Sequence, residues 1–181
     1  MPETSGGELL QREDVLVRTV EYGGYTKAEL LAQMQAASIM LNENARILFS
    51  SQLFETAASR QSASVVEMSV ADLGFPEGAS FPEMLERAQE LGLSACPLEL
   101  GPYFRLRYLD QREHAETRKN RAPAGSVTIM SIPLSDSDDF PKGFYLRRID
   151  GALCLRGYTC DMEHVWDPAD RVAFRISASS V

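Results

Sequence analysis

The residues best suited to chemistry lie in one stretch near the C-terminus, where arginines and tyrosines alternate with apolar side chains. Asp150-Gly151 separates two β-rich runs, 144–149 and 152–158. Asp-Gly in that setting predicts a β-hairpin with a two-residue type I′ turn, and a turn of that length fixes the register of the two strands. The predicted cross-strand pairs are Ile149 with Ala152, Arg147 with Cys154, and Tyr145 with Arg156.

This register gathers cationic, phenolic and thiol side chains on one face of the hairpin and apolar side chains on the other. The first face carries Tyr145, Arg147, Ile149, Cys154, Arg156 and Tyr158, and the second carries Phe144, Leu146, Arg148, Leu153 and Leu155. Arginines between aromatic rings suit a carboxylate, a phosphate or an acidic protein segment, because the guanidinium presents a planar fork of donors. The predicted ligand-binding residues are Tyr145, Arg147, Arg156 and Tyr158, joined by Arg105 and Arg107 from a strand expected at 103–109.

A structural role for the same face is the alternative. In that interpretation the residues form the solvated side of an antiparallel sheet, and each arginine lies over a tyrosine and pairs with a nearby carboxylate. The acidic residues that flank the hairpin are Asp136, Asp138, Asp139, Asp161 and Glu163. Whether these carboxylates neutralise the arginines separates the two interpretations.

Four residues near the hairpin are candidates for catalysis: His164, Glu163, Asp161 and Cys154. A histidine beside a carboxylate could transfer protons, and a cysteine beside a histidine could act as a nucleophile. The acidic group also suits a hard metal ion, but its spacing matches no EF-hand loop and favours a surface turn. The chain has two histidines and no GxxxxGK[ST], GxGxxG, HExxH or GxSxG motif. We therefore predict no metal site and no cofactor, and leave enzymatic activity uncertain.

The charge of the chain argues against general binding to polyanions. Among 181 residues, 18 are Lys or Arg and 26 are Asp or Glu, which gives a net charge of −8. The first 109 residues hold 8 basic and 15 acidic side chains and so carry −7 of that charge. Such a balance disfavours nucleic acid and anionic membrane surfaces as partners.

Sequence features also indicate a cytoplasmic protein. No run approaches the roughly 18 apolar residues of a membrane helix, and the acidic residues 1–8 do not resemble a secretory signal. The three cysteines, Cys96, Cys154 and Cys160, show no CxxC spacing. An odd number of cysteines without such spacing fits a reducing compartment.

The elements expected to position these residues alternate between strands and helices. We expect strands at 15–22, 65–70, 103–109, 126–134 and 172–176 besides the hairpin. Capping boxes at Thr26–Glu29 and Ser80–Glu83 predict helix starts, and Asn42 predicts a third. A long, charged segment at 110–126 is expected to be a solvated, mobile loop.

Together these elements predict an α+β fold in which N-terminal helices pack with an antiparallel sheet. We expect a disordered tail at 1–8 followed by one domain at 9–181. Within that domain, residues 9–64 would form a helical part and residues 65–181 an α/β part.

The C-terminal segments resemble a group of small bacterial proteins of unassigned function. The resemblance rests on Asp138-Asp-Phe-Pro-Lys-Gly-Phe-Tyr-Leu-Arg-Arg-Ile-Asp-Gly, on Leu155-Arg-Gly-Tyr158 and on His164-Val-Trp-Asp-Pro168. It implies a bacterial source and transfers no activity, cofactor or site.

These observations favour a cytosolic binding or regulatory protein that recognises a small anionic ligand or an acidic protein segment through the arginine–tyrosine face. One alternative is a small hydrolase or transferase acting on a phosphorylated or nucleotide substrate, with His164 and Asp161 or Glu163 transferring protons. Another is an acidic inhibitor that occupies a basic partner. A concave pocket containing His164 would favour the enzyme, a flat face would favour the binding protein, and the oligomeric state is left open.

Overall fold

The computed structural model describes residues 5–114 and 121–178, and within them the chain folds into five helices and ten strands. The helices are α1 (Gly6–Leu9), α2 (Lys27–Ala36), α3 (Glu43–Ser50), α4 (Phe81–Glu90) and α5 (Leu100–Arg107). The strands are β1 (Leu16–Tyr22), β2 (Met40–Leu41), β3 (Gln61–Ser69), β4 (Ala79–Ser80), β5 (Leu93–Ser94), β6 (Val127–Ile129), β7 (Gly143–Ile149), β8 (Ala152–Tyr158), β9 (Val165–Trp166) and β10 (Arg171–Ile176). The α+β class expected from the sequence is confirmed.

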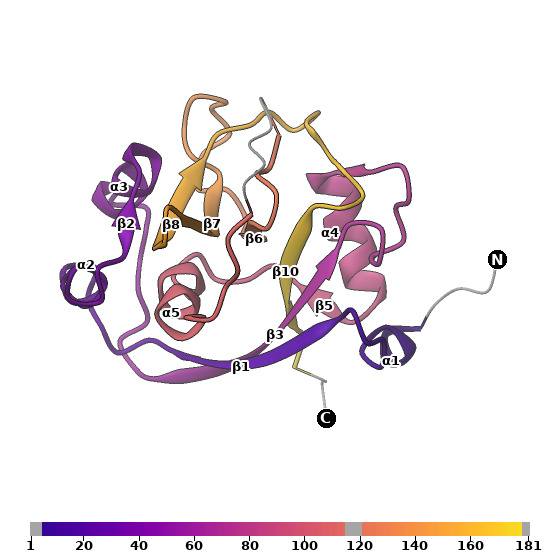
Figure 1. Cartoon of the computed structure of the whole chain (residues 1–181), viewed down its shortest axis with the longest axis horizontal. Coiled ribbons are helices and arrows are strands. Elements are labelled where there is room, and N and C mark those ends of the chain that lie inside the picture. The colour runs from indigo at the N-terminus through magenta and orange to yellow at the C-terminus, as the bar shows by residue number, and fades with distance from the viewer. Residues whose placement is uncertain (1–4, 115–120, 179–181) are drawn as a thin grey trace.

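Eight of these strands form one strongly curled sheet (Figure 1). Its order is β1-β3-β10-β6-β7-β8-β2, with β5 paired to β10 off this path. Most pairs are antiparallel, but β6 pairs with β10 in parallel and β2 pairs with β8 in parallel. The sheet is therefore mixed and not purely antiparallel. The remaining two strands, β4 and β9, form a small separate sheet.

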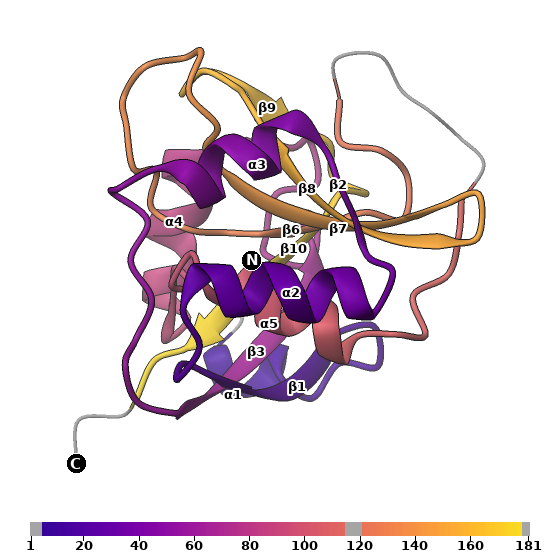
Figure 2. The same cartoon turned by 90° about the vertical axis from the view of Figure 1, so that its left-hand side faces the viewer.

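The curled sheet has a core on each face, and the period-two alternation of its strands divides the side chains between them. Helix α5 lies inside the curl and α4 lies outside it against β3 and β10 (Figures 1 and 2). Along β3, Val65 joins the inner core, whereas Val66 and Met68 join the outer core. Side chains of the sheet that belong to neither core reach the surface on its inner or its outer face.

Local signals in the sequence determine where the helices start. Thr26 and Ser80 form the expected capping boxes at α2 and α4. The Asn42 side chain accepts a hydrogen bond from the Ala45 amide at the start of α3. Each contact satisfies a backbone N–H that has no partner within the helix.

The strand expected at 103–109 is wrong, because these residues belong mostly to α5. The alternation of arginines with apolar residues suggested a strand, but Leu100, Tyr103 and Phe104 are all buried and recur at helical spacing. At Gly101 the helix approaches β7 so closely that a Cβ atom would lie 2.9 Å from the Phe144 side chain. Helix α5 can therefore pack inside the curled sheet only because position 101 is a glycine.

Three expectations about chain organisation also need correction. Residues 6–8 of the expected tail 1–8 belong to α1 (Gly6–Leu9), which Ser5 caps, while residues 1–4 lie outside the described part. Residues 9–64 are not a helical subdomain, because they supply β1, β2 and the start of β3 to the main sheet. The strand expected at 126–134 is shorter and ends at Ile129.

The segment expected as a mobile loop, 110–126, is held to the hairpin at its start. Gln111 is 2% exposed, and its side-chain amide donates to the carbonyl oxygens of Gly125 and Leu146 at 2.9 and 3.0 Å. The Glu113 carboxylate accepts from the turn amides of Asp150 and Gly151 at 2.6 and 2.9 Å. Residues 115–120 lie outside the described part of the chain.

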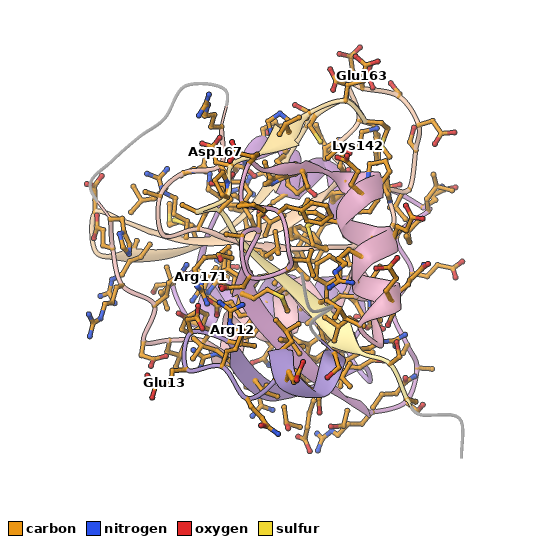
Figure 3. All side chains as sticks on the ribbon, turned by 90° about the vertical axis from the view of Figure 1, so that its right-hand side faces the viewer. Arg12, Glu13, Lys142, Glu163, Asp167 and Arg171 are labelled. Carbon is orange, nitrogen blue, oxygen red and sulfur yellow. The ribbon has the colours of Figure 1, made fainter. Side chains whose placement is uncertain are left out.

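A buried ion pair fastens β10 to β3. The Glu67 carboxylate, 3% exposed, lies 2.7 Å from Nε of Arg171. Close by, Arg12 bonds Asp72 at 2.7 Å and joins the end of α1 to the residues after β3 (Figure 3). Within the described residues no helix has both the length and the apolar character needed to cross a membrane.

Candidate functional site

The β7–β8 hairpin carries the candidate site, and its register is the one predicted from the sequence. Ile149 pairs with Ala152, Arg147 with Cys154, and Tyr145 with Arg156. The turn residues Asp150 and Gly151 both have positive φ, 49° and 78°, as a type I′ turn requires.

The two faces of the hairpin also separate as expected. Phe144, Leu146 and Leu155 are fully buried in the inner core. Tyr145 and Arg156 are half-buried on the outer face, and Thr128 of β6 continues their cross-strand row because it pairs with Tyr145. The outer surface of β6, β7 and β8 is thus one continuous platform.

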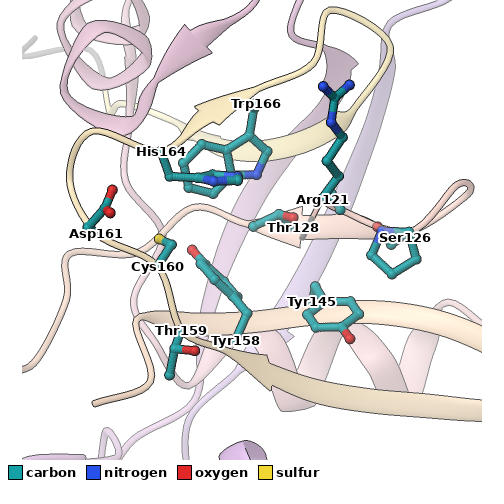
Figure 4. Close-up of a pocket in the computed structure, with 12 residues that line it drawn as sticks. Arg121, Ser126, Thr128, Tyr145, Tyr158, Thr159, Cys160, Asp161, His164 and Trp166 are labelled. Atoms are coloured by element: carbon teal, nitrogen blue, oxygen red, sulfur yellow. The ribbon is translucent and has the colours of Figure 1, made fainter. Parts of the chain in front are cut away.

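A recess of about 340 Å³ opens on this platform. Its floor is the outer face of β6–β8, and its walls are the segments 121–126 and 159–166 (Figure 4). The lining residues are Arg121, Ala122, Pro123, Ser126, Thr128, Tyr145, Tyr158, Thr159, Cys160, Asp161, His164 and Trp166. Its volume falls at the small end of the roughly 300–1,000 Å³ typical of ligand sites.

Aromatic rings dominate the walls of the recess. The Trp166 ring contacts that of His164 edge-on at a centroid distance of 4.6 Å and that of Tyr158 at 6.2 Å. Tyr145 continues the series at 6.3 Å from Tyr158. These T-shaped and tilted contacts hold the four rings against one another along the recess.

Several polar side-chain atoms face the recess without a protein partner. Within the described part of the chain, no hydrogen bond is made by the hydroxyls of Ser126, Thr128 and Tyr158 or by the indole N–H of Trp166. Ser126, Thr128 and Trp166 are each 3% exposed. Burial also raises the pKa of Tyr158, so its hydroxyl stays protonated and able to donate. Among the described residues none of these four atoms is both buried and unpartnered, so each still reaches the open space of the recess, where it is available to a ligand.

The two hairpin arginines lie beside the recess and lack carboxylate partners. Nε of Arg156 donates to the Tyr145 hydroxyl at 2.8 Å, whereas Nε of Arg147 is buried without a hydrogen bond. Among the described residues no carboxylate oxygen comes within 4.0 Å of either guanidinium. The flanking acidic residues thus form no ion pair with these arginines, although the pKa of Glu113, which the Gly151 and Asp150 amides lower most, is also lowered by Arg148 and Arg147.

Arg105 is not part of this surface. It lies on α5, is 0% exposed, and donates to the Gln111 side chain, to the Tyr108 carbonyl and to the Cys154 carbonyl. Burial lowers the pKa of Arg105 to about 10. Arg105 is therefore a buried structural residue that links α5 to the hairpin, and its assignment as a ligand-binding residue is wrong.

Arg107 also lies away from the candidate site. Its guanidinium is 3.7 Å from Glu21 on β1, and both side chains are exposed. The helical geometry of α5 explains this separation, since the strand that would have carried Arg105 and Arg107 to the hairpin does not exist.

The four catalytic candidates divide between the recess and its surroundings. His164 and Asp161 line the recess. Glu163 is exposed at the outer edge of the molecule (Figure 3), and Cys154 is 3% exposed and outside the lining. Asp161 accepts from the Glu163 amide at 3.0 Å, and His164 makes no hydrogen bond to a carboxylate in the described residues. No acid–base pair is assembled there.

The cysteines near the recess are thiols at neutral pH. Burial raises the pKa of Cys160 to about 11 and also raises that of Cys154. Because the thiolate is the nucleophilic form, neither has the character of an activated cysteine. Within the described residues no three His, Cys, Asp or Glu side chains gather closely enough to hold a metal ion.

Several recess residues were not predicted from the sequence. Thr128 had one weak signal, a lone hydroxyl between the apolar residues of β6. Trp166 belongs to the outer core at 3% exposure, and its ring also lines the recess. Nη1 of Arg121 donates to both carboxylate oxygens of Asp167, at 2.9 and 2.8 Å, and so links the two walls, which only the fold brings together.

Comparison with known proteins adds no identification: the chain matches no known protein family, no curated protein and no solved structure.

Proposed function

We propose that this protein binds a small anionic ligand that carries a ring, with the ring in the recess and the acidic group at Arg147 and Arg156. The observation that carries the proposal is an aromatic recess whose polar atoms have no partner among the described residues, next to two arginines that form no ion pair with a carboxylate of those residues. A ligand with both parts would satisfy the recess and the arginines together.

The concave shape favours a small molecule over an acidic protein segment. A peptide strand needs a groove or a free sheet edge, whereas this site lies on the face of β6–β8, with a wall segment on two sides. Tyr145 connects the two parts of the site, since its ring lines the recess and its hydroxyl accepts from Arg156. An acidic partner segment is an outcome that the experiment below can reveal.

Binding without catalysis is the activity that the geometry supports. His164 packs on Trp166 and has no carboxylate among the described residues to orient it, and general acid–base catalysis needs a group held in hydrogen-bond reach of its proton. Cys160 lines the recess as a protonated thiol. A ligand here would be held and not transformed.

Isothermal titration calorimetry tests the proposal with named probes: 4-hydroxybenzoate, nicotinate, AMP and CMP. At least one should bind with 1:1 stoichiometry and change the emission of Trp166, which is the only tryptophan in the chain. Replacing Arg147 and Arg156 together by Gln should weaken binding at least tenfold, because charge-assisted hydrogen bonds contribute about 1.5–3 kcal/mol each.

Arg148→Gln is the matched control, since Arg148 follows Arg147 on the same strand but faces the other side. It should bind the probe as the wild-type protein does. Absence of binding by all four probes would overturn the proposal. Equal affinity of the double variant and the wild type would also overturn it, as would binding of an Asp- and Glu-rich peptide in place of the small probes.

A further inference from the structure

We infer that the ring is a nucleobase and that the ligand is a nucleoside 5′-monophosphate. This inference rests on the proposed function and narrows it from ring-bearing anions in general to one chemical class. It follows from three properties of the site: flat aromatic walls, polar groups that face the edge of a ring, and a separate cationic pair.

The walls suit a flat, extended π-system. Figure 4 shows Trp166 and His164 on one side of the recess and Tyr158 and Tyr145 on the other. Nucleobases stack on aromatic side chains whatever their sequence identity, because every base has a π-face. The rings in this recess already hold one another in place, so little side-chain conformational entropy is lost when a base binds.

The unpartnered polar groups distinguish a base from a plain hydrocarbon ring. The hydroxyls of Thr128 and Tyr158 can donate and accept, and the indole N–H of Trp166 can donate. A phenyl ring would bury these groups without partners, which is unfavourable. A nucleobase carries donors and acceptors around its edge and can pair with them.

The charge of the lining disfavours the phosphate inside the recess, whose volume of about 340 Å³ accommodates a base and its sugar. Arg121 also lines the recess but is paired with Asp167, so among the described charged groups of the lining Asp161 adds a negative charge that disfavours a phosphate there. The favourable exit runs past Tyr145, whose hydroxyl lies 2.8 Å from Nε of Arg156.

The arginine pair then receives the phosphate. Arg147 and Arg156 occupy diagonal positions on neighbouring strands of one face, a spacing within reach of long side chains. Nε of Arg147 is buried and Nε of Arg156 already donates to Tyr145, so the terminal guanidinium nitrogens are the donors that a phosphate would meet. Two guanidinium groups match the charge of one phosphate dianion and can form forked hydrogen bonds to it.

The test compares ligands that differ by one part. AMP, CMP, GMP and UMP are titrated beside their nucleosides, ribose 5-phosphate and inorganic phosphate. At least one monophosphate should bind tenfold or more tightly than its own nucleoside and than ribose 5-phosphate. In the Arg147→Gln/Arg156→Gln variant the monophosphate and its nucleoside should bind equally, whereas Arg148→Gln should keep the tenfold difference.

Base recognition is tested separately from phosphate binding. Thr128→Val keeps the shape of the side chain and removes the hydroxyl, and Tyr158→Phe removes the phenol. Each should weaken the nucleoside and the monophosphate by the same factor, about threefold to thirtyfold. Circular dichroism melting checks that each variant is folded, and if one is not, the other provides the comparison.

The outcomes separate this inference from the proposed function. Binding of 4-hydroxybenzoate or nicotinate without any monophosphate would overturn the nucleotide assignment and leave the ring-bearing anion in place. Ribose 5-phosphate binding as tightly as the monophosphates would also overturn it, because the base would then contribute nothing. Failure of every ring-bearing anion would overturn both.

Discussion

Replacing Arg105 by Met tests whether this buried arginine stabilises the hairpin that carries the candidate site. Arg105 is the largest fully buried side chain in the described residues. Its guanidinium donates to four acceptors from different parts of the fold: the Tyr108 carbonyl after α5, the Gln111 side chain, and the carbonyls of Arg147 in β7 and Cys154 in β8. Methionine fills similar space and donates no hydrogen bond.

The expected loss of stability follows from these acceptors. Each buried acceptor left without a donor costs about 1–3 kcal/mol. Part of this cost is offset because the guanidinium is itself poorly solvated, as its pKa lowered to about 10 and its unpartnered Nε show. We therefore expect Arg105→Met to lower the free energy of unfolding by about 2–4 kcal/mol, the range of disruptive core substitutions.

Urea denaturation measures this change, followed by far-UV circular dichroism and by Trp166 fluorescence. The control is Arg107→Met on the same helix, where the side chain is 63% exposed and its contact with Glu21 is a surface pair. Surface ion pairs contribute little, so the control should stay within about 0.5 kcal/mol of the wild type. If the unfolding free energy of Arg105→Met lies within about 1 kcal/mol of the wild type, the stabilising role assigned to the Arg105 hydrogen bonds is wrong.

Three further predictions concern other parts of the molecule. The alkylation rate of Cys160 by iodoacetamide should keep rising up to about pH 11, because burial raises its pKa to about 11, and mass spectrometry should show no plateau near 9. Arg171→Met should lower the free energy of unfolding by about 2–3 kcal/mol because it leaves the 3%-exposed carboxylate of Glu67 uncompensated, and a second change, Glu67→Gln, should restore most of it in urea titrations. Gly151→Ala should cost about 1 kcal/mol because φ is 78° at that position; thermal melting should show no such loss for Gly7→Ala, where a Cβ meets nothing within 4 Å.

The separation of the two cores explains how the molecule combines a rigid fold with a surface site. The inner core, around α5, fixes the hairpin from beneath. The outer core, around α4, extends to Trp166 and reaches Tyr158 at the wall of the recess. The recess lies where the outer core ends, so its floor is as rigid as the sheet while its polar groups still face open space.

Local interactions determined the features that the sequence predicted by itself. The register and turn type of the hairpin follow from Asp150-Gly151, because a two-residue loop needs positive φ at both positions and admits one alignment. The helix starts at Thr26 and Ser80 follow from side chains that bond amides three residues away. Each of these contacts is complete within a few residues, so the sequence contains all the information that it needs.

Only the tertiary structure decided which residues share the site. The arginines of 103–109 alternate as in a strand, yet burial of Leu100, Tyr103 and Phe104 inside the curled sheet makes the segment a helix. The recess brings residues 121–128 beside residues 145 and 158–166, and loops and strand order set these distances without a local signature. Hydrophobic burial is non-directional and sums over the whole chain, so no local pattern shows which distant segments will pack together. The sequence therefore identified the hairpin face but could not predict the recess beside it.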